Sequence, residues 1–568
     1  MIGVRNYKHF TAFVFVFLLS AYTCFAQEIS SQLNPSIKLT KTKIFDNNAA
    51  SFSEKYNLIS TATQTIDMIY FIIDNDYSTS LFFQNVIQKL SLAHKQGTPL
   101  RVRVLVDYFM SEKQLPFFRL LESYGIQIKR YGGPDSKWVE DLKNFKINSE
   151  SFLSGLMAQD LNLLKYSLPE DLKEIFKDTD FSKLKPEEKI SFILSVAQRI
   201  GPNGPKIYKG LRNFLYRTHH KLLLIDGNCF MTGGRNLSDE YHSSRGDVLI
   251  DGNSELGIQA RHYPFQDTDV SSCLKNSLNY SESPLTQSFE RLWNHSLNVN
   301  LQTNFTAAER DTSNVTKSEE LHRKAELARH LLKTNQSFYS LEKEDGLDAE
   351  YIENIMTPTS LINSGITDHY TKLFNSLEEG DEASFVNAYF YLDPKIFTNN
   401  PEKDLKMKLL YNSLIGAAQR KAKLTIHTNS LTTTDLSIVN VMSYPFYRFF
   451  INEKILIKEL SKRPDLDQGS LHKKTAYFHR PQKNDVLIVG SYNLDARSHY
   501  KDTNVALSIQ IPKELSYSTF EAYKKHTSES IQWDELDPDR LKVIDDTIVN
   551  DKNKIKLRRF LFPFKTEI

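Results

Sequence analysis

The chain has 568 residues, which at roughly one domain per 150 residues is enough for about four small domains or two larger ones. Hydrophobic residues make up 40%, aromatic residues 12% and charged residues 25%, so wholesale disorder, collagen-like repeats and a polytopic membrane protein are disfavoured. With 71 Lys and Arg against 69 Asp and Glu, the net charge of +2 indicates no general attraction to nucleic acid or to an anionic membrane. Any anionic partner is therefore expected to be bound locally.

Residues 1–26 have the pattern of an export signal. Basic residues precede an apolar stretch that begins at Phe10, and Ala21 and Ala26 are small residues near a cleavage point. The alternative is an uncleaved membrane anchor, since the apolar character extends through Phe25 and approaches the ~20 residues of a spanning helix. We expect a periplasmic or secreted protein, either released or anchored through this segment.

Residues 41–299 alternate strand-like and helix-like runs, which is the pattern of βαβ units. The predicted elements are strands at 66–73, 100–106, 126–131, 219–226 and 229–234 and helices at 81–93 and 115–123. Residues 144–211 are charged, have helical spacing and lack a counterpart later in the chain. We interpret them as a helical insertion that is either a lid or a surface elaboration.

Residues 361–568 repeat the same order of elements. The predicted elements are strands at 385–392, 424–428, 455–460, 471–478 and 486–491 and helices at 405–420 and 444–452. The polar residues 300–360 between the two segments are predicted to form a linker that includes one helix. The sequence therefore predicts two similar α/β halves.

Each half contains a histidine and a lysine two residues apart on a predicted strand. The pairs are His219 with Lys221 and His472 with Lys474. At this spacing both side chains leave the same face of the strand, so an imidazole and an ammonium group converge. The next strand ends in Gly-Gly-Arg-Asn at Asn236 or Gly-Ser-Tyr-Asn at Asn493, where small residues allow close backbone approach and the amide can donate hydrogen bonds. Two such copies predict an anion-binding site.

Three cysteines occur in the chain, and they exclude a disulfide scaffold and a four-cysteine zinc site. After removal of residues 1–26 the chain keeps Cys229 and Cys273, which either pair in an oxidising compartment or are buried as small hydrophobic side chains. We expect neither a metal nor a cofactor.

The paired motifs resemble those of the phospholipase D superfamily, and the wider sequence is most similar to its bacterial cardiolipin synthase-like branch. The likeness extends to the segments around Tyr70, before Asp107, at 428–435 and at the C-terminus. The resemblance implies two α/β halves, each a mixed sheet flanked by helices, packed around one active site at their interface. It also implies a phosphodiesterase or phosphatidyltransferase.

Two histidines suit the chemistry of a phosphodiester, which repels anionic nucleophiles and has a leaving group that needs a proton. One neutral imidazole attacks phosphorus to give a covalent phosphohistidine, and the other donates a proton to the departing oxygen. The expected groups that hold the non-bridging oxygens are Lys221, Lys474, Asn236 and Asn493. Water then gives hydrolysis, whereas an alcohol or a lipid hydroxyl gives transfer, and the motif does not choose between them.

Spacing predicts the roles of the two histidines. Asp247 lies 28 residues after His219, and Asn504 lies 32 residues after His472, with four extra residues in a turn of the second copy. The two positions therefore correspond, and in the family a carboxylate there orients the histidine. Because a carboxylate favours the imidazolium that forms on attack, we predict that His219 is the nucleophile and His472 the general acid and base.

The second copy departs from the family in one further position. Asp226 completes the first motif as a supporting residue, whereas His479 stands where the family has aspartate. Its odd offset from His472 points the side chain to the other face of the strand, which indicates a structural role. Together with Asn504, this change leaves a catalytically weakened lipid-binding protein as an alternative.

Export and the resemblance favour a phospholipid substrate at a membrane surface. The tail 552–565 mixes basic and aromatic residues and either contacts such a surface or packs as a terminal helix. A nuclease of the same superfamily is the other alternative, although the small net charge and the lack of a dense basic stripe disfavour nucleic acid. The polar loop 428–435 either selects the acceptor or simply forms a turn.

Overall fold

The structure, a computed structural model, describes residues 35–133, 216–242, 266–301, 307–333, 338–356, 361–393, 400–434, 437–460, 470–525 and 533–550. The predicted signal segment 1–26, the predicted insertion 144–211, Asp247 and the tail 552–565 lie outside these residues.

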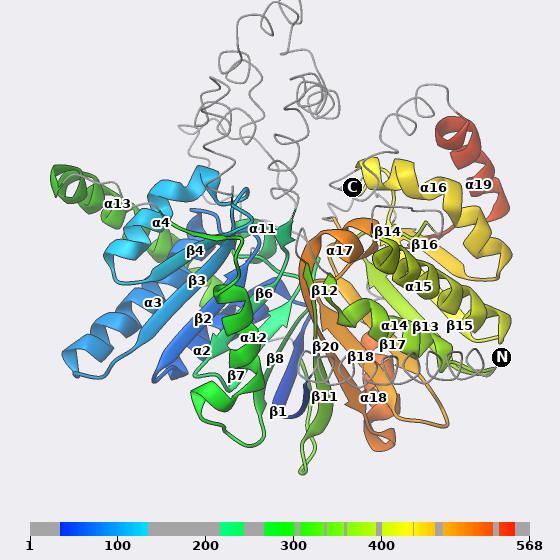
Figure 1. The fold of residues 1–568 in the computed structure, drawn as a ribbon, viewed down its shortest axis with the longest axis horizontal. Helices are drawn as coiled ribbons and strands as arrows, with labels where there is room; N and C mark the ends of the chain where they lie inside the picture. Colours follow the sequence, from blue (N-terminus) through cyan, green and yellow to red (C-terminus); the bar gives the residue numbers. More distant parts are fainter. Residues whose placement is uncertain are drawn as a thin grey trace, which may run out of the picture.

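The described residues form two α/β halves that share one large mixed sheet (Figure 1). This arrangement confirms the predicted fold class. In the first half the strands run, from the outer edge inward, in the order β9 (Asn298–Asn300), β4 (Gln127–Tyr131), β3 (Arg101–Asp107), β2 (Thr65–Tyr70), β6 (Lys221–Ile225), β7 (Cys229–Gly233), β8 (Asp269–Leu274) and β1 (Ser36–Phe45). Strands β2, β3 and β4 are parallel, and the remaining neighbours are antiparallel.

The second half repeats this order. Its strands run, again from the outer edge inward, in the order β21 (Trp533–Glu535), β16 (Leu456–Leu460), β15 (Lys423–Asn429), β13 (Glu382–Asn387), β17 (Lys474–His479), β18 (Asp485–Gly490), β20 (Asp502–Ile511) and β11 (Leu347–Met356). The halves join where β1 and β11 pair antiparallel, with Ser36 opposite Glu350. The duplicated sequence therefore folds into one sheet with approximate twofold symmetry about this strand pair.

Shorter strands complete the described sheets. They are β10 (Tyr339–Leu341) beside β1, β12 (Leu361–Ser364) beside β11, β5 (Arg217–Thr218) beside β20, and the separate pair β14 (Phe390–Tyr391) and β19 (Leu494–Asp495).

Helices cover both faces of the sheet, as alternation of buried apolar side chains along its strands requires. On one face of the first half lie α2 (Asn48–Thr61), α3 (Tyr77–Lys95), α4 (Leu115–Ser123) and α13 (Ala307–Ala328), and on the corresponding face of the second half lie α14 (Gly365–Asn375), α15 (Pro401–Gln419), α16 (Ser437–Asn452) and α19 (Pro538–Ile544). The opposite face carries α12 (Pro284–Trp293) and α18 (Lys513–Lys524) over a third core that runs across both halves. Two short helices, α11 (Asp239–His242) and α17 (Ala496–Tyr500), lie near the junction of the halves (Figure 1).

The segment 300–360 is more than the predicted linker. Helix α13 packs on α3, and β11 is one of the two central strands of the sheet. The linker was predicted to include one helix, whereas β11 was not predicted, because two of its polar side chains, Glu353 and Asn354, are fully buried.

Cys229 and Cys273 lie directly opposite each other on β7 and β8 and form a disulfide bond. Of the two alternatives left open by the sequence, the structure has the bonded one. In the part of the chain that the structure describes, no helix combines the length and the apolar character needed to cross a membrane.

Candidate active site

The two motif pairs lie at the N-terminal ends of β6 and β17. The C-terminal ends of the neighbouring strands β2 and β13 lie beside them. Lys221 is paired with Tyr70 at the end of β2, and Lys474 with Asn387 at the end of β13. Both lysines and both histidines are buried, with exposures of 8% for His219 and 6% for His472. Each lysine Nζ donates to the carbonyl oxygen of the histidine two residues earlier, at 2.9 Å for Lys221.

His219 is held by the second half. Its backbone N–H donates to the carbonyl oxygen of Thr503 at 2.8 Å. Its Nδ1 lies 2.9 Å from the carbonyl oxygen of Ser491 and 3.1 Å from Oδ1 of Asn504. Both neighbours accept hydrogen bonds, so Nδ1 carries the proton and Nε2 keeps a lone pair.

His472 is held by the first half in the same way. Its backbone N–H donates to the carbonyl oxygen of Gln266 at 2.8 Å. Its Nδ1 lies 2.7 Å from Oδ2 of Asp267, and the ring also hydrogen-bonds the backbone of Gly234. Each half thus supplies one histidine and the groups that orient the other.

The predicted orienting residues need correction. Asn504 was expected to serve His472, but it contacts His219. The side chain on His472 is Asp267, which sequence reasoning missed, while Asp247 is outside the described residues. Strand register explains the equivalence, because Gly233 lies opposite Asp269 and Gly490 opposite Ala506, so that Asp267 and Asn504 occupy the same position two residues earlier.

Burial and mutual repulsion set the electrostatics of the site. Burial lowers the pKa of His219 and of His472 well below the ordinary imidazole value, and Lys221 and Lys474 lower both further. The pKa of His219 is also lowered by His472, so the two rings from the two halves lie in one electrostatic environment. Burial raises the pKa of Asp267 to about 6 against the opposing effect of Lys474 and Arg235. The pocket therefore favours a bound anion that would offset the lysine charges.

Asn493 and Asn236 follow Ser491 and Gly234, whose backbones contact the two histidines, by two residues, and both asparagines have unused hydrogen-bonding capacity. Asn236 is fully buried, and its Oδ1 accepts from the backbone N–H of Ile72 at 3.1 Å. Its Nδ2 has no partner among the described residues, and neither has Oδ1 of Asn493. A buried donor without a partner is costly unless a ligand satisfies it, so Asn236 fits the predicted role of holding a non-bridging oxygen.

Two glycines of the motifs, Gly234 and Gly490, allow close packing of neighbouring segments of the protein. A Cβ on Gly234 would overlap the carboxylate of Asp267, and one on Gly490 would overlap the carbonyl oxygen of Val505. Their small size lets the neighbouring strand bring Asp267 and Asn504 up to the histidines.

An aromatic side chain lies edge-on to each catalytic-site imidazole. Phe71 is 5.0 Å from His219 between ring centroids, and Tyr241 is 5.2 Å from His472. Nζ of Lys221 also lies 5.2 Å from the centre of the Phe71 ring. These contacts restrict rotation of the imidazoles and exclude water from them.

The remaining motif positions support structure. The carboxylate of Asp226 accepts hydrogen bonds from Thr63, Gln64 and Thr65 ahead of β2. In the second copy Nδ1 of His479 lies 2.9 Å from Oδ2 of Asp485, which also accepts from Tyr477. These contacts lie at the far ends of β6 and β17 from the histidines, in agreement with the structural role expected for His479.

Within the predicted loop 428–435, Asn429 is the last residue of β15 and supports the site from outside. Asn429 accepts from the N–H of Leu471 at 2.9 Å and donates to its carbonyl oxygen at 2.7 Å, and thus fixes the residue before His472. Asp107 acts likewise on the other side, where it accepts from the N–H of Thr218 at 3.3 Å and pairs with Arg217 at 2.9 Å.

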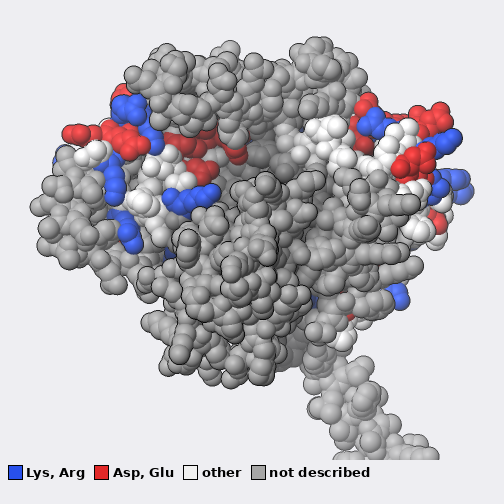
Figure 2. Space-filling model, turned by 90° about the horizontal axis from the view of Figure 1, so that it is seen from above, with Lys and Arg blue, Asp and Glu red and all other residues white. Residues whose placement is uncertain are grey.

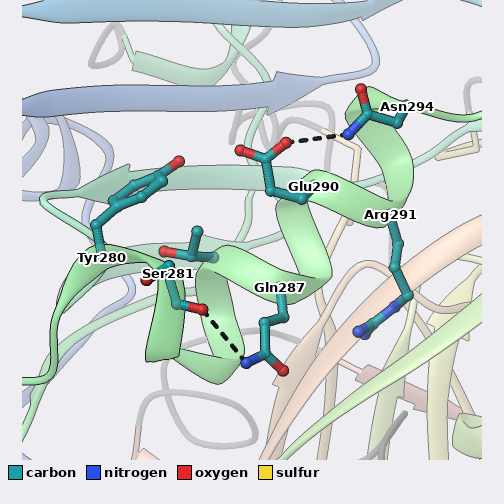
Figure 3. Close-up of a pocket in the computed structure, with 7 residues that line it drawn as sticks. Tyr280, Ser281, Gln287, Glu290, Arg291 and Asn294 are labelled. Atoms are coloured by element: carbon teal, nitrogen blue, oxygen red, sulfur yellow. Dashed lines mark hydrogen bonds between the residues drawn. The ribbon is translucent and has the colours of Figure 1, made fainter.

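A separate surface pocket lies over α12 and is lined by Tyr280, Ser281, Thr286, Gln287, Glu290, Arg291 and Asn294 (Figure 3). None of the motif residues lines it. Within the described residues, no group of three or more His, Cys, Asp or Glu side chains is arranged to hold a metal ion.

Residues 386–526 match the family model described as cardiolipin synthase, phospholipase D-like domain. This match confirms the resemblance that the paired motifs indicate. No curated protein matches the chain in sequence.

Several solved structures are similar to this chain at low sequence identity. The phosphatidylserine synthase of Haemophilus influenzae Rd KW20 has a TM-score of 0.53 at 11% identity, over 95% of this chain and 97% of that one. The phospholipase D family member Nuc of Salmonella typhimurium has a TM-score of 0.22 at 12% identity, over 33% of this chain and 98% of that one. The polyphosphate kinase of Porphyromonas gingivalis has a TM-score of 0.38 at 9% identity, over 93% and 53%. At these identities the first match shows a common fold and no more.

We expect sulfate to bind in this pocket, and to bind more tightly as the pH falls below neutrality. Burial lowers the pKa of both histidines, and a bound anion stabilises their protonated forms. Protonation of the imidazoles therefore strengthens anion binding, and anion binding raises their pKa. Lys221→Met and Lys474→Met should each weaken binding by about 10-fold, the loss of one charge-assisted contact. Calorimetric titration at several pH values measures this, with Lys129→Met as control because that ammonium packs on Trp293. Equal affinity in all four proteins would contradict an anion pocket between the lysines.

Proposed function

We propose that this chain, whose residues 386–526 match a phospholipase D-like domain, cleaves or exchanges the head-group phosphodiester of phospholipids through a phosphohistidine on His219. The observation that carries the proposal is the pair of buried histidines, one from each half, held beside Lys221 and Lys474. The proposed substrate class is supported by the description of the matched domain and by the similar fold of a phosphatidylserine synthase.

His219 suits the nucleophile because its Nδ1 donates only to neutral acceptors. Burial and the two lysines also hold the pKa of this imidazole well below its ordinary value, which favours the neutral ring, so Nε2 presents its lone pair to phosphorus. As the Nε2–P bond forms, the bond from phosphorus to the head-group oxygen breaks. The groups that hold the non-bridging oxygens during this step are Lys221, Lys474, Asn236 and Asn493.

His472 suits the general acid because it hydrogen-bonds a carboxylate, Asp267. That carboxylate favours the imidazolium form once a bound phosphate offsets the lysine charges, and Nε2 then gives its proton to the leaving oxygen. In the second step the neutral His472 takes a proton from water or an alcohol, whose oxygen attacks phosphorus as the bond to His219 breaks. The role assignment made from the sequence is thus kept, but on a different basis: the carboxylate serves the acid.

Products on defined lipids test the reaction. Purified protein is incubated with phosphatidylglycerol, phosphatidylcholine or single-stranded DNA, with and without added ethanol. We expect phosphatidic acid from a lipid, and phosphatidylethanol when the alcohol is present. The variants His219→Ala and His472→Ala should each lower the rate by at least about 1,000-fold, because each removes a group that takes part in bond exchange.

Cleavage of DNA alone would favour the superfamily nuclease. Full retention of every measurable function by His219→Ala would favour a binding protein. In the two patches of described residues that Figure 2 colours, basic and acidic side chains are intermixed.

A separate experiment tests the covalent step. The reaction is stopped during turnover without acid, which would cleave a phosphohistidine, and the modified residue is located by peptide mass spectrometry. We expect the phosphatidyl group on His219, and no adduct in His219→Ala, which lacks the attacking nitrogen. The adduct on His472 would reverse the assignment.

We further propose that the protein is exported. The Cys229–Cys273 disulfide supports this, since such bonds persist in oxidising compartments. Expression of the whole chain, cell fractionation and thiol alkylation should give an extracytoplasmic protein without residues 1–26 and with both thiols protected. A full-length cytoplasmic protein in which Cys229 and Cys273 both react with the alkylating reagent would refute export.

A further inference from the structure

The residue between histidine and lysine is buried in both motifs. His220 is 0% exposed and Lys473 3%. Because side chains alternate along a strand, both point away from the anion pocket, behind the catalytic residues. Neither belongs to the machinery described above, yet each makes a specific contact with an acidic residue.

His220 contacts a fully buried carboxylate of the central strand β11. Its Nε2 lies 3.3 Å from Oε1 of Glu353, whose other oxygen accepts from Arg291 at 2.9 Å. Burial alone would raise the pKa of Glu353, but the hydrogen bond with His220 and the charge of Arg291 hold it below its ordinary value. Arg291 leaves α12 in a different direction from Glu290 and forms the outer end of this network (Figure 3).

Lys473 makes the corresponding contact in the other half. Its Nζ donates to Oδ1 of Asp46 at 2.8 Å, immediately after β1. Phe45 lies opposite Asp269 on β8, and Ile352 lies opposite Ala506 on β20, so the next residues, Asp46 and Glu353, occupy equivalent positions. The duplication therefore keeps an acidic partner in the same place although the paired base differs.

Each of these contacts reaches a threonine next to a residue that orients a catalytic histidine. Nδ1 of His220 lies 3.1 Å from Oγ1 of Thr503. The carbonyl oxygen of Thr503 accepts from the N–H of His219 at 2.8 Å, and the next residue is Asn504. In the other half Thr268, which follows Asp267, donates to the same Asp46 oxygen at 2.5 Å.

We propose that His220 and Glu353 are positioning residues that fix the start of β20 and thereby hold the imidazole of His219 in line for attack. Without them the acceptors of the His219 N–H and Nδ1 can shift, and the ring loses its orientation. The kinetic part of this proposal rests on the proposed function, whereas the positional part does not.

The test compares His220→Ala, His220→Gln and Glu353→Gln with His369→Ala. His369 is the matched control because it bridges the same two strands, 2.9 Å from Ser508 on β20 and 3.6 Å from Glu350 on β11. We expect His220→Ala to lower kcat by about 10- to 100-fold with little change in KM, the size of effect expected for a misplaced group. Gln can still donate to Glu353 and should recover most of the loss, and Glu353→Gln should lose activity like His220→Ala.

The imidazole ¹⁵N resonances of His219 give a readout that needs no turnover. They should shift in His220→Ala and Glu353→Gln and stay unchanged in His369→Ala. Unchanged kcat and unchanged resonances in the network variants would overturn the proposal, as would an equal loss in the control. If His220→Ala does not fold, His220→Gln and Glu353→Gln carry the comparison. If the wild type turns over no phospholipid, the proposed function fails, and the resonances alone decide on positioning.

Discussion

The site depends on one reciprocal arrangement: the histidine of each motif is oriented by the half that does not carry it. His219 is held by Ser491, Thr503 and Asn504, and His472 by Gly234, Gln266 and Asp267. Since buried polar groups are stable only when paired, neither motif could be buried in an isolated half without losing its partners. The β1–β11 strand pair keeps the halves in the register that these contacts require.

The fold could be predicted where apolar periodicity was strong. Strand β2 is buried at all six positions and α4 spans Leu115–Ser123, and both were expected from the sequence. The strands β1, β8, β11 and β20 were not, because they carry buried polar residues such as Thr42, Ser271 and Glu353. Those residues are polar because they build the junction and the site, so the pattern that identifies a strand is weakest where the function is concentrated.

The sequence predicted the histidines and lysines of the site, but it did not predict which side chain orients each histidine. Alternation along a strand places His219 with Lys221, and His472 with Lys474, without knowledge of other strands. The partner of each histidine comes from the other half of the protein. The residue spacing within one copy of the motif therefore cannot identify that partner. Asp-Thr-Asp-Val at 267–270 resembles Asp-Thr-Asn-Val at 502–505, a signal that points to β8, although register shows the match to be displaced by two residues.

Joining both copies in one polypeptide frees them from being identical. In a symmetric homodimer a mutation enters both sites at once, so two equivalent positions could never hold Asp267 on one side and Asn504 on the other. Here each copy can change alone, so one histidine keeps a carboxylate partner while the other has an amide. A single chain can therefore give the two halves of one site different chemical surroundings.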